Sequence, residues 1–272
     1  MKCWSASCTC LLLCFCLFLP ALRAQGILYQ YQHQKISSKA GNFKEKLRRY
    51  DHFGRGLALL PDLDGDGVDE LAVGATGNDE AGENSGAVYI LFLNRSGKVR
   101  ASQKIRVKEG NVAGKLQPQG QFGWAITCPG DLDGDGTADL AVGEPGRDEG
   151  GRDAGAVWLL LLKPNGEVKS SQKISRLEGD FQGGTGPGFR FGAALASLQG
   201  AASRRVLAVG TDMQNEAAKG EIWLLFLNQQ GSVESQLKIT EGTAGFPYEL
   251  RAGDRFGSAL ASLGDLDGDG RP

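Results

Sequence analysis

The stretch FGWAITCPGDLDGDGTADLAVG, residues 122–143, decides the fold, because its parts return along the chain at a nearly constant interval. Its Phe-Gly pair recurs at Phe53, Phe122, Phe191 and Phe256, with spacings of 69, 69 and 65 residues. A Lys-Ile pair recurs in the same phase, at residues 35–36, 104–105, 173–174 and 238–239. Self-similarity at a fixed period is typical of a repeat architecture.

Each repeat predicts four short strands. The first follows the Phe-Gly pair, the second is the LAVG segment, the third is an apolar run such as GAVWLLLLK, and the fourth ends at Lys-Ile. The third run is apolar at successive positions, as expected of a strand buried on both faces, and its Tyr89, Trp158 and Trp223 are expected in the core. In the fourth repeat, a first strand is expected over residues 257–263. Four-stranded units repeated radially are the blades of a β-propeller, so the predicted fold class is all-β.

Composition narrows the class of protein. The 272 residues include 41 Gly, and 30 basic against 32 acidic residues give a formal net charge of −2. This balance offers no basic footprint for nucleic acid, and the 41% hydrophobic content excludes global disorder. With only 2 His, a His-based metal site or catalytic triad is not expected.

The first residues have the pattern of a secretory signal peptide. Lys2 precedes the apolar run of residues 11–19, and small residues lead to an expected cleavage after Ala24. Residues 1–24 are therefore assigned to the signal peptide and residues 25–272 to the propeller, which places the protein outside the cell. Five of the 6 Cys lie in this leader, so Cys128 remains alone and no disulfide framework is expected. No later apolar stretch has the length of a membrane span.

Acidic loops between the first and second strands carry the strongest chemical signal. Carboxylates stand at every second position, and Gly at the fourth and sixth positions permits the positive φ of a tightly curved loop. Such carboxylates converge on one point, which suits a hard cation with about six to eight oxygen ligands, such as Ca²⁺. The expected ligands of the first loop are Asp62, Asp64, Asp66, the carbonyl of Val68, and Glu70. Those of the second loop are Asp131, Asp133, Asp135, the carbonyl of Thr137, and Asp139.

The other two repeats differ. A third acidic loop has Asp265, Asp267 and Asp269, but the sequence stops before its ninth position. The third repeat has no acid between Phe191 and Thr211, and Arg204 and Arg205 stand near the missing carboxylates, where an arginine is a hypothetical substitute for the cation. An EF-hand is excluded, because the twelfth position of each complete loop is a Val inside a predicted strand. Mg²⁺ fits less well, because it prefers strict octahedral geometry.

The order Phe-Gly, DxDGDGxxD and LAVG resembles the FG-GAP repeats of integrin alpha-chain propellers and their secreted relatives. The resemblance covers residues 27–272 and implies Ca²⁺ at loop positions 1, 3, 5, 7 and 9. It also implies a seven-bladed propeller whose ligands meet the face opposite the calcium loops. The connections at roughly 40–52, 109–121, 178–190 and 242–255 are then candidate binding loops. The endings Val-Gly-Ala-Thr and Val-Gly-Thr-Asp depart from the family pattern, and no beta-subunit partner is inferred.

The repeats are expected at about 53–121, 122–190, 191–255 and 256–272, which gives three blades and half of a fourth. Such a partial propeller predicts a truncated product, with self-association that completes the ring as the alternative. An open arc would expose strand edges that proteins normally protect.

The functional hypothesis is a non-enzymatic, calcium-stabilised adhesion or interaction module for an extracellular protein or matrix ligand. The alternatives are a carbohydrate-binding propeller and the accessory propeller of an extracellular enzyme. Asn94, in the sequence Asn-Arg-Ser, is a candidate N-glycosylation site on a predicted turn. Trp124, directly after a Phe-Gly pair, is a candidate to line a ligand cleft.

Overall fold

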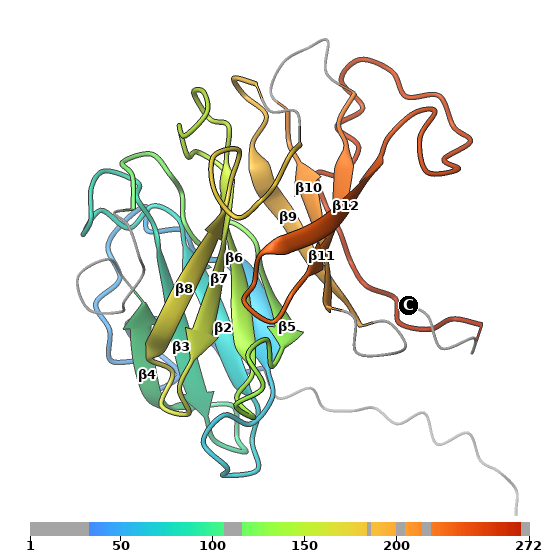
Figure 1. The fold of residues 1–272 in the computed structure, drawn as a ribbon. Coiled ribbons are helices and arrows are strands. Elements are labelled where there is room, and N and C mark those ends of the chain that lie inside the picture. The colour runs from blue at the N-terminus through green and yellow to red at the C-terminus, as the bar shows by residue number, and fades with distance from the viewer. Residues whose placement is uncertain (1–32, 106–115, 184–185, 200–204, 214–218, 268–272) are drawn as a thin grey trace, which may run out of the picture. The chain divides into compact units, whose positions relative to one another are not determined.

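The described part of the chain contains three antiparallel sheets of four strands each in the computed structural model (Figure 1). The structure describes residues 33–105, 116–183, 186–199, 205–213 and 219–267, so the predicted signal peptide lies outside the described residues. Each sheet is a meander in which sequential strands are neighbours. The fold is therefore all-β, and the three sheets are blades of an incomplete β-propeller, as the sequence predicts.

The strands follow the predicted order within each repeat. The first sheet contains β1 (Phe53–Leu60), β2 (Glu70–Ala75), β3 (Ala87–Leu93) and β4 (Val99–Ile105). The second contains β5 (Ile126–Gly130), β6 (Asp139–Glu144), β7 (Ala156–Leu162) and β8 (Val168–Ile174). The third contains β9 (Phe191–Gln199), β10 (Arg205–Thr211), β11 (Ile222–Leu227) and β12 (Val233–Ile239). The turns between third and fourth strands contain Gly97, Gly166 and Gly231 at φ of 72°, 77° and 79°, which explains the glycine in each turn.

The second sheet is buried on both faces, because alternate side chains of a strand point to opposite sides. On β7, Trp158 and Leu160 belong to a core shared with the first sheet, whereas Val157 and Leu159 belong to a core shared with the third. Tyr89, Trp158 and Trp223 are 1%, 0% and 6% exposed, which confirms that these aromatic residues are in the core.

Neighbouring blades meet through pairs of glycines. A Cβ built on Gly74 of β2 would lie 2.0 Å from the carbonyl oxygen of Gly123, the glycine of the next Phe-Gly pair. The corresponding distances are 2.0 Å from Gly143 to Gly192 and 1.9 Å from Gly210 to Gly257. The second strand of each blade therefore has room only for glycine at the end of its LAVG-type segment, where the next repeat begins.

The fourth repeat begins as predicted but does not form the expected strand. Gly220 forms a parallel bridge with Phe256, as Gly155 does with Phe191 one repeat earlier. Residues 257–263, however, belong to no strand, so the prediction of a strand there was wrong. The physical reason is that the first strand of a blade is ordered by pairing with the second, and the described residues up to Asp267 contain no second strand. Within the described ranges, no helix is long and apolar enough to cross a membrane.

Candidate metal centres

The first acidic loop joins β1 to β2 and is curved by hydrogen bonds to its first aspartate. The amides of Gly65 and Asp66 donate to Asp62 Oδ1 at 2.8 and 3.1 Å, and the amide of Gly67 donates to Oδ2 at 2.8 Å. Gly65 and Gly67 have φ of 79° and 80°, a region that favours glycine. These hydrogen bonds hold the pKa of Asp62 below its ordinary value, and the bond from the Gly67 amide has the largest effect.

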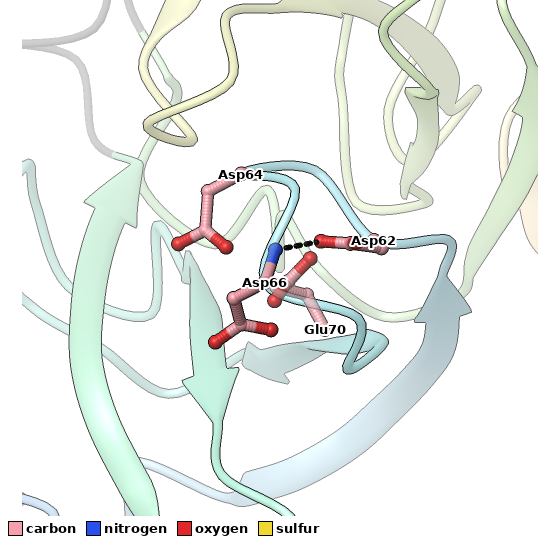
Figure 2. A group of neighbouring side chains, drawn as sticks. All are labelled: Asp62, Asp64, Asp66 and Glu70. Atoms are coloured by element: carbon pink, nitrogen blue, oxygen red, sulfur yellow. Dashed lines mark hydrogen bonds between the residues drawn. The ribbon is translucent and has the colours of Figure 1, made fainter.

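Glu70 closes this loop from the first residue of β2, and its side chain is buried. The amide of Leu63 donates to Glu70 Oε2 at 2.6 Å, whereas Oε1 has no hydrogen-bond partner among the described residues. Burial raises the pKa of Glu70, and the nearby aspartates raise it further. One carboxylate oxygen from each of Asp62, Asp64, Asp66 and Glu70 lies within 4.8 Å of the others (Figure 2). Ligand distances of about 2.3–2.6 Å would let one Ca²⁺ reach such oxygens.

The second loop, between β5 and β6, repeats this arrangement with one difference. Gly134 and Gly136 donate to the two oxygens of Asp131 at 2.7 and 2.8 Å. Asp139 is buried and accepts from the amides of Leu132 at 2.7 Å and Leu162 at 2.9 Å. Burial is the main reason that the pKa of Asp139 rises to about 6.

The structure brings three of the four expected carboxylates of the second loop together. Asp131, Asp133 and Asp139 place one oxygen each within 4.8 Å of one another, and Asp135 lies outside this set. The amide of Thr137 donates to Asp135 Oδ1 at 2.8 Å, as the amide of Val68 donates to Asp66 Oδ1 at 2.9 Å in the first loop.

A basic side chain from the fourth strand contacts each of the two complete acidic loops, and sequence reasoning missed this contact. Arg100 Nη2 of β4 lies 2.5 Å from Asp64 Oδ2 and 2.9 Å from Asp66 Oδ2. Lys169 Nζ of β8 lies 2.5 Å from Oδ2 of both Asp133 and Asp135. The bond from Lys169 lowers the pKa of Asp135. The signal was available, because Arg100 and Lys169 occupy the same position of two aligned repeats.

The remaining predicted site residues are not assembled into such a cluster within the described ranges. Asp265 and Asp267 are exposed, and Asp269 lies outside the described residues. In the third repeat Arg204 also lies outside the described residues, whereas Arg205 of β10 donates to the carbonyl oxygen of Asp131 at 3.5 Å. Arg205 thus reaches across to the second blade.

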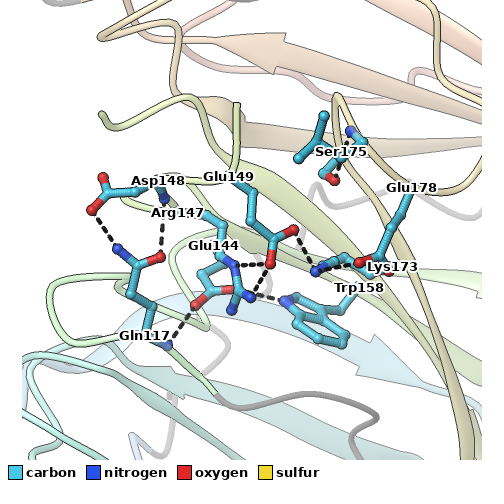
Figure 3. A network of polar contacts seen from close by, with 10 residues as sticks. Gln117, Glu144, Arg147, Asp148, Glu149, Trp158, Lys173, Ser175 and Glu178 are labelled. Carbon is cyan, nitrogen blue, oxygen red and sulfur yellow. Dashed lines mark hydrogen bonds and ion pairs between the residues drawn. The ribbon is translucent and has the colours of Figure 1, made fainter. Parts of the chain in front are cut away.

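At the opposite ends of the strands, a second polar network surrounds Glu144 at the end of β6 (Figure 3). Glu144 is buried, and its oxygens accept from Trp158 Nε1 at 2.7 Å and from the Gln117 amide at 3.3 Å. Burial raises its pKa, and Arg147 opposes this rise. Lys173 contacts Glu149 and lies 2.9 Å from Glu178.

The same network explains the recurring Lys-Ile pair. In three of the four pairs, the lysine faces the aromatic residue of the third strand across the ladder: Lys104 faces Tyr89, Lys173 faces Trp158 and Lys238 faces Trp223. Each ammonium lies over its ring, at 5.2, 5.5 and 5.7 Å from the centroid. These are cation–π contacts, so the lysine contributes to packing rather than to a metal site.

In calcium-free buffer, the free energy of unfolding is expected to fall as the pH rises from about 4 to about 7. Asp139 binds its proton up to about pH 6 when folded but has an ordinary pKa of 3.8, so the native state binds more protons in this window. Asp62 and Asp135 have lowered pKa values, so in the folded state they titrate below this pH window. Urea unfolding across the window should show a loss of about 2 kcal/mol, less than the full shift implies because the adjacent loop is solvated. Saturating calcium should remove most of this loss, and a gain in stability without calcium would contradict it.

Comparison with known proteins identifies two of the repeats that the sequence pattern indicates. The FG-GAP repeat family model matches residues 53–91 and 123–160. The chain is 33% identical to integrin alpha-PS2 of Drosophila melanogaster over 151 residues, which are 54% of this chain and 10% of that protein. It is 35% identical to integrin alpha-X of Mus musculus over 115 residues, or 42% of this chain and 9% of the relative.

A second group of relatives is enzymatic. The chain is 28% identical over 178 residues to phosphatidylinositol-glycan-specific phospholipase D of Rattus norvegicus, which is 65% of this chain and 20% of that protein. The chain thus spans about a tenth of these integrins and a fifth of this phospholipase. The repeats, the propeller blades and these relatives agree: the chain contains FG-GAP repeats and is similar to integrin alpha chains.

Proposed function

We propose that the chain is a secreted or cell-surface interaction module whose two acidic loops bind structural Ca²⁺. Buried Glu70 is the observation that carries this proposal. Its Oε1 has no hydrogen-bond partner among the described residues, yet the side chain joins three aspartates that place oxygens within 4.8 Å of one another. An uncompensated buried charge is costly, and a divalent cation would compensate it.

The donor set favours Ca²⁺ over the alternatives. All side-chain donors are carboxylate oxygens, and the carbonyls of Val68 and Thr137 would complete the expected coordination. Asp62, Asp64, Asp66 and Glu70 would hold one ion, and Asp131, Asp133, Asp135 and Asp139 the other. A bound ion would offset the repulsion among carboxylates at the end of each first hairpin and tie the first strand to the second. Calcium would therefore stabilise the blades rather than take part in a reaction.

The opposite ends of the strands support a ligand-binding face. Two guanidinium groups lie over the Trp124 ring, Arg55 at 3.8 Å and Arg190 at 5.1 Å from its centroid. Arg55 is exposed at the start of β1, whereas the acidic loop follows the end of the same strand. Arginine stacked on an aromatic ring is held ready to recognise a carboxylate, so we propose an acidic extracellular protein or matrix ligand at this face.

Extracellular placement is part of the same proposal. Integrin and phospholipase D relatives support it, as does the exposed Asn94 in the turn after β3. Asn94 Oδ1 accepts from the Ser96 hydroxyl at 2.7 Å, which places both residues of the glycosylation sequence in one tight turn. An accessory role in an extracellular enzyme is the second candidate, because 65% of the chain matches a phospholipase D.

Calcium is expected to raise the melting temperature of the purified chain relative to the same protein in chelator. Binding to the folded state alone adds about 2 kcal/mol per site at a roughly twentyfold excess over the Kd. For a chain of this size, two sites then correspond to a rise of roughly 8–16 °C. Circular dichroism melts in calcium, in magnesium and in chelator measure the effect, with the smaller rise expected for magnesium. Superimposable melts in all three buffers would refute structural calcium.

A further inference from the structure

The basic residue on the fourth strand sits in the same place in both acidic blades. Arg100 and Lys169 are each the second residue of their strand, β4 and β8, and these are edge strands in the sheet order (Figure 1). Both side chains are partly exposed, at 42% and 37%, and both reach two carboxylates of their own blade's loop. An arrangement that recurs in two separate blades is a property of the repeat.

In the third blade, the charge of the fourth-strand residue and the charge near the loop are both opposite to those of the first two blades. Its fourth strand, β12, carries Glu234 at the position of Arg100 and Lys169, since Val233 aligns with Val99 and Val168. Its loop has lost the aspartates and has Arg205 in their vicinity. Glu234 and Arg205 line the same surface pocket. The charge on the fourth strand therefore changes sign with the charge of the loop, and a residue kept only for strand formation would not need to do so.

The basic side chains occupy oxygens that a metal ion would use. Lys169 Nζ bonds Asp133 Oδ2 and Asp135 Oδ2, and Asp135 is the one expected carboxylate that lies outside the cluster of the second loop. In the first loop, Arg100 bonds two of the four clustered aspartate and glutamate side chains. An ion that takes about six to eight oxygens must gather these same carboxylates.

We propose that Arg100 and Lys169 are built-in counter-ions that compete with calcium for the acidic loops. This inference rests on the proposed calcium function. In the empty loop, the cation reduces repulsion among the carboxylates and keeps the hairpin in shape. When the ion binds, the cation must withdraw, and its repulsion with the dication weakens binding. One positive charge roughly 5 Å from a divalent ion in water corresponds to an affinity about tenfold weaker.

The experiment is a calcium titration of the full chain by isothermal calorimetry, on four proteins in the same calcium-free buffer. Lys169→Gln removes the proposed counter-ion, and Lys169→Arg keeps its charge. Lys163→Gln is the matched control, because Lys163 lies in the same blade but pairs with Glu167, at 3.0 Å. We expect one site of Lys169→Gln to bind calcium about tenfold more tightly. Lys169→Arg and Lys163→Gln should stay within about twofold of the natural protein.

The melting temperature is the second readout. In chelator, we expect Lys169→Gln to lower the melting temperature, although the same substitution tightens calcium binding. The loss in chelator is expected because the carboxylates have lost their counter-ion, and calcium should then raise the melting temperature of this variant by more. Equal calcium affinities in all four proteins would overturn the counter-ion role while leaving calcium binding intact. No calcium binding by any of them would overturn both proposals. Arg100→Gln repeats the test at the first loop if Lys169→Gln does not fold.

Discussion

Replacement of Gly143 by alanine is expected to destabilise the protein by about 3 kcal/mol or more, as a severe overpacking change. The new Cβ would lie 2.0 Å from the carbonyl oxygen of Gly192, and this neighbour is backbone rather than a flexible side chain. Gly143 is in β6 and Gly192 is in β9, so relief of the clash requires the second and third sheets to move apart. Urea unfolding followed by tryptophan fluorescence measures the loss.

Gly186→Ala is the matched control for this prediction. A Cβ added at Gly186 would meet no heavy atom within 4 Å, and Gly186 does not require the left-handed region of φ. Its replacement should change the free energy of unfolding by less than about 0.5 kcal/mol, as for most surface positions. If Gly143→Ala and Gly186→Ala unfold at the same urea concentration, the glycine contact does not hold the sheets together.

The contact between Gly143 and Gly192 shows why the repeat could be recognised from the sequence, whereas the packing role of its glycines could not. Phe-Gly and LAVG stand out because they recur, and their strands could be predicted from local patterns of apolar residues and turn glycines. The contact joins the second strand of one repeat to the start of the next, as Gly74 does with Gly123. A pattern along the chain indicates which residues recur, but which recurring residues touch depends on how the sheets pack.

The part of each acidic loop that lies within one hairpin could be predicted from the sequence. Asp62, Asp64, Asp66 and Glu70 gather within one hairpin, so their spacing sufficed to predict the cluster. The basic partner on the fourth strand was not predicted, because Arg100 is 36 residues from Asp64 and reaches it only after the sheet has formed. Alignment of the repeats could have found it, since Arg100, Lys169 and Glu234 change sign with their loops.

The prediction of a strand over residues 257–263 was wrong although the local sequence pattern is present. Its sequence resembles the first strand of the other blades, and its Phe-Gly pair docks as theirs do, with Gly257 against Gly210. Local pattern and docking are thus both present. What the described residues lack is the hydrogen-bonding partner that Glu70–Ala75 supplies to β1, and backbone groups of a strand need that ladder.

Glu70→Gln is expected to change stability in opposite directions with and without calcium. In calcium-free buffer near neutral pH it should stabilise the protein by about 1 kcal/mol, because it removes a buried charge. Its amide oxygen can accept from the Leu63 amide, and its NH₂ group can donate to the loop aspartates that now repel Glu70. In saturating calcium it should lose about 2 kcal/mol, because the first loop no longer has its buried anionic ligand. Glu83→Gln, an exposed acid-to-amide change in the same blade, should do neither.

Asp139→Asn separates this explanation from a general benefit of removing a buried acid. Both oxygens of Asp139 accept backbone N–H groups, from Leu132 and Leu162, and asparagine offers only one oxygen. Its NH₂ group would face a donor, which costs about 1–3 kcal/mol for an unsatisfied buried group. In calcium-free buffer Asp139→Asn should therefore lack the gain of Glu70→Gln, and both variants should lose calcium-dependent stability. Urea unfolding of the two variants with and without calcium measures all four values. A gain by Glu70→Gln that persists in saturating calcium would mean that Glu70 is not a ligand, because the only effect left would be relief of its burial.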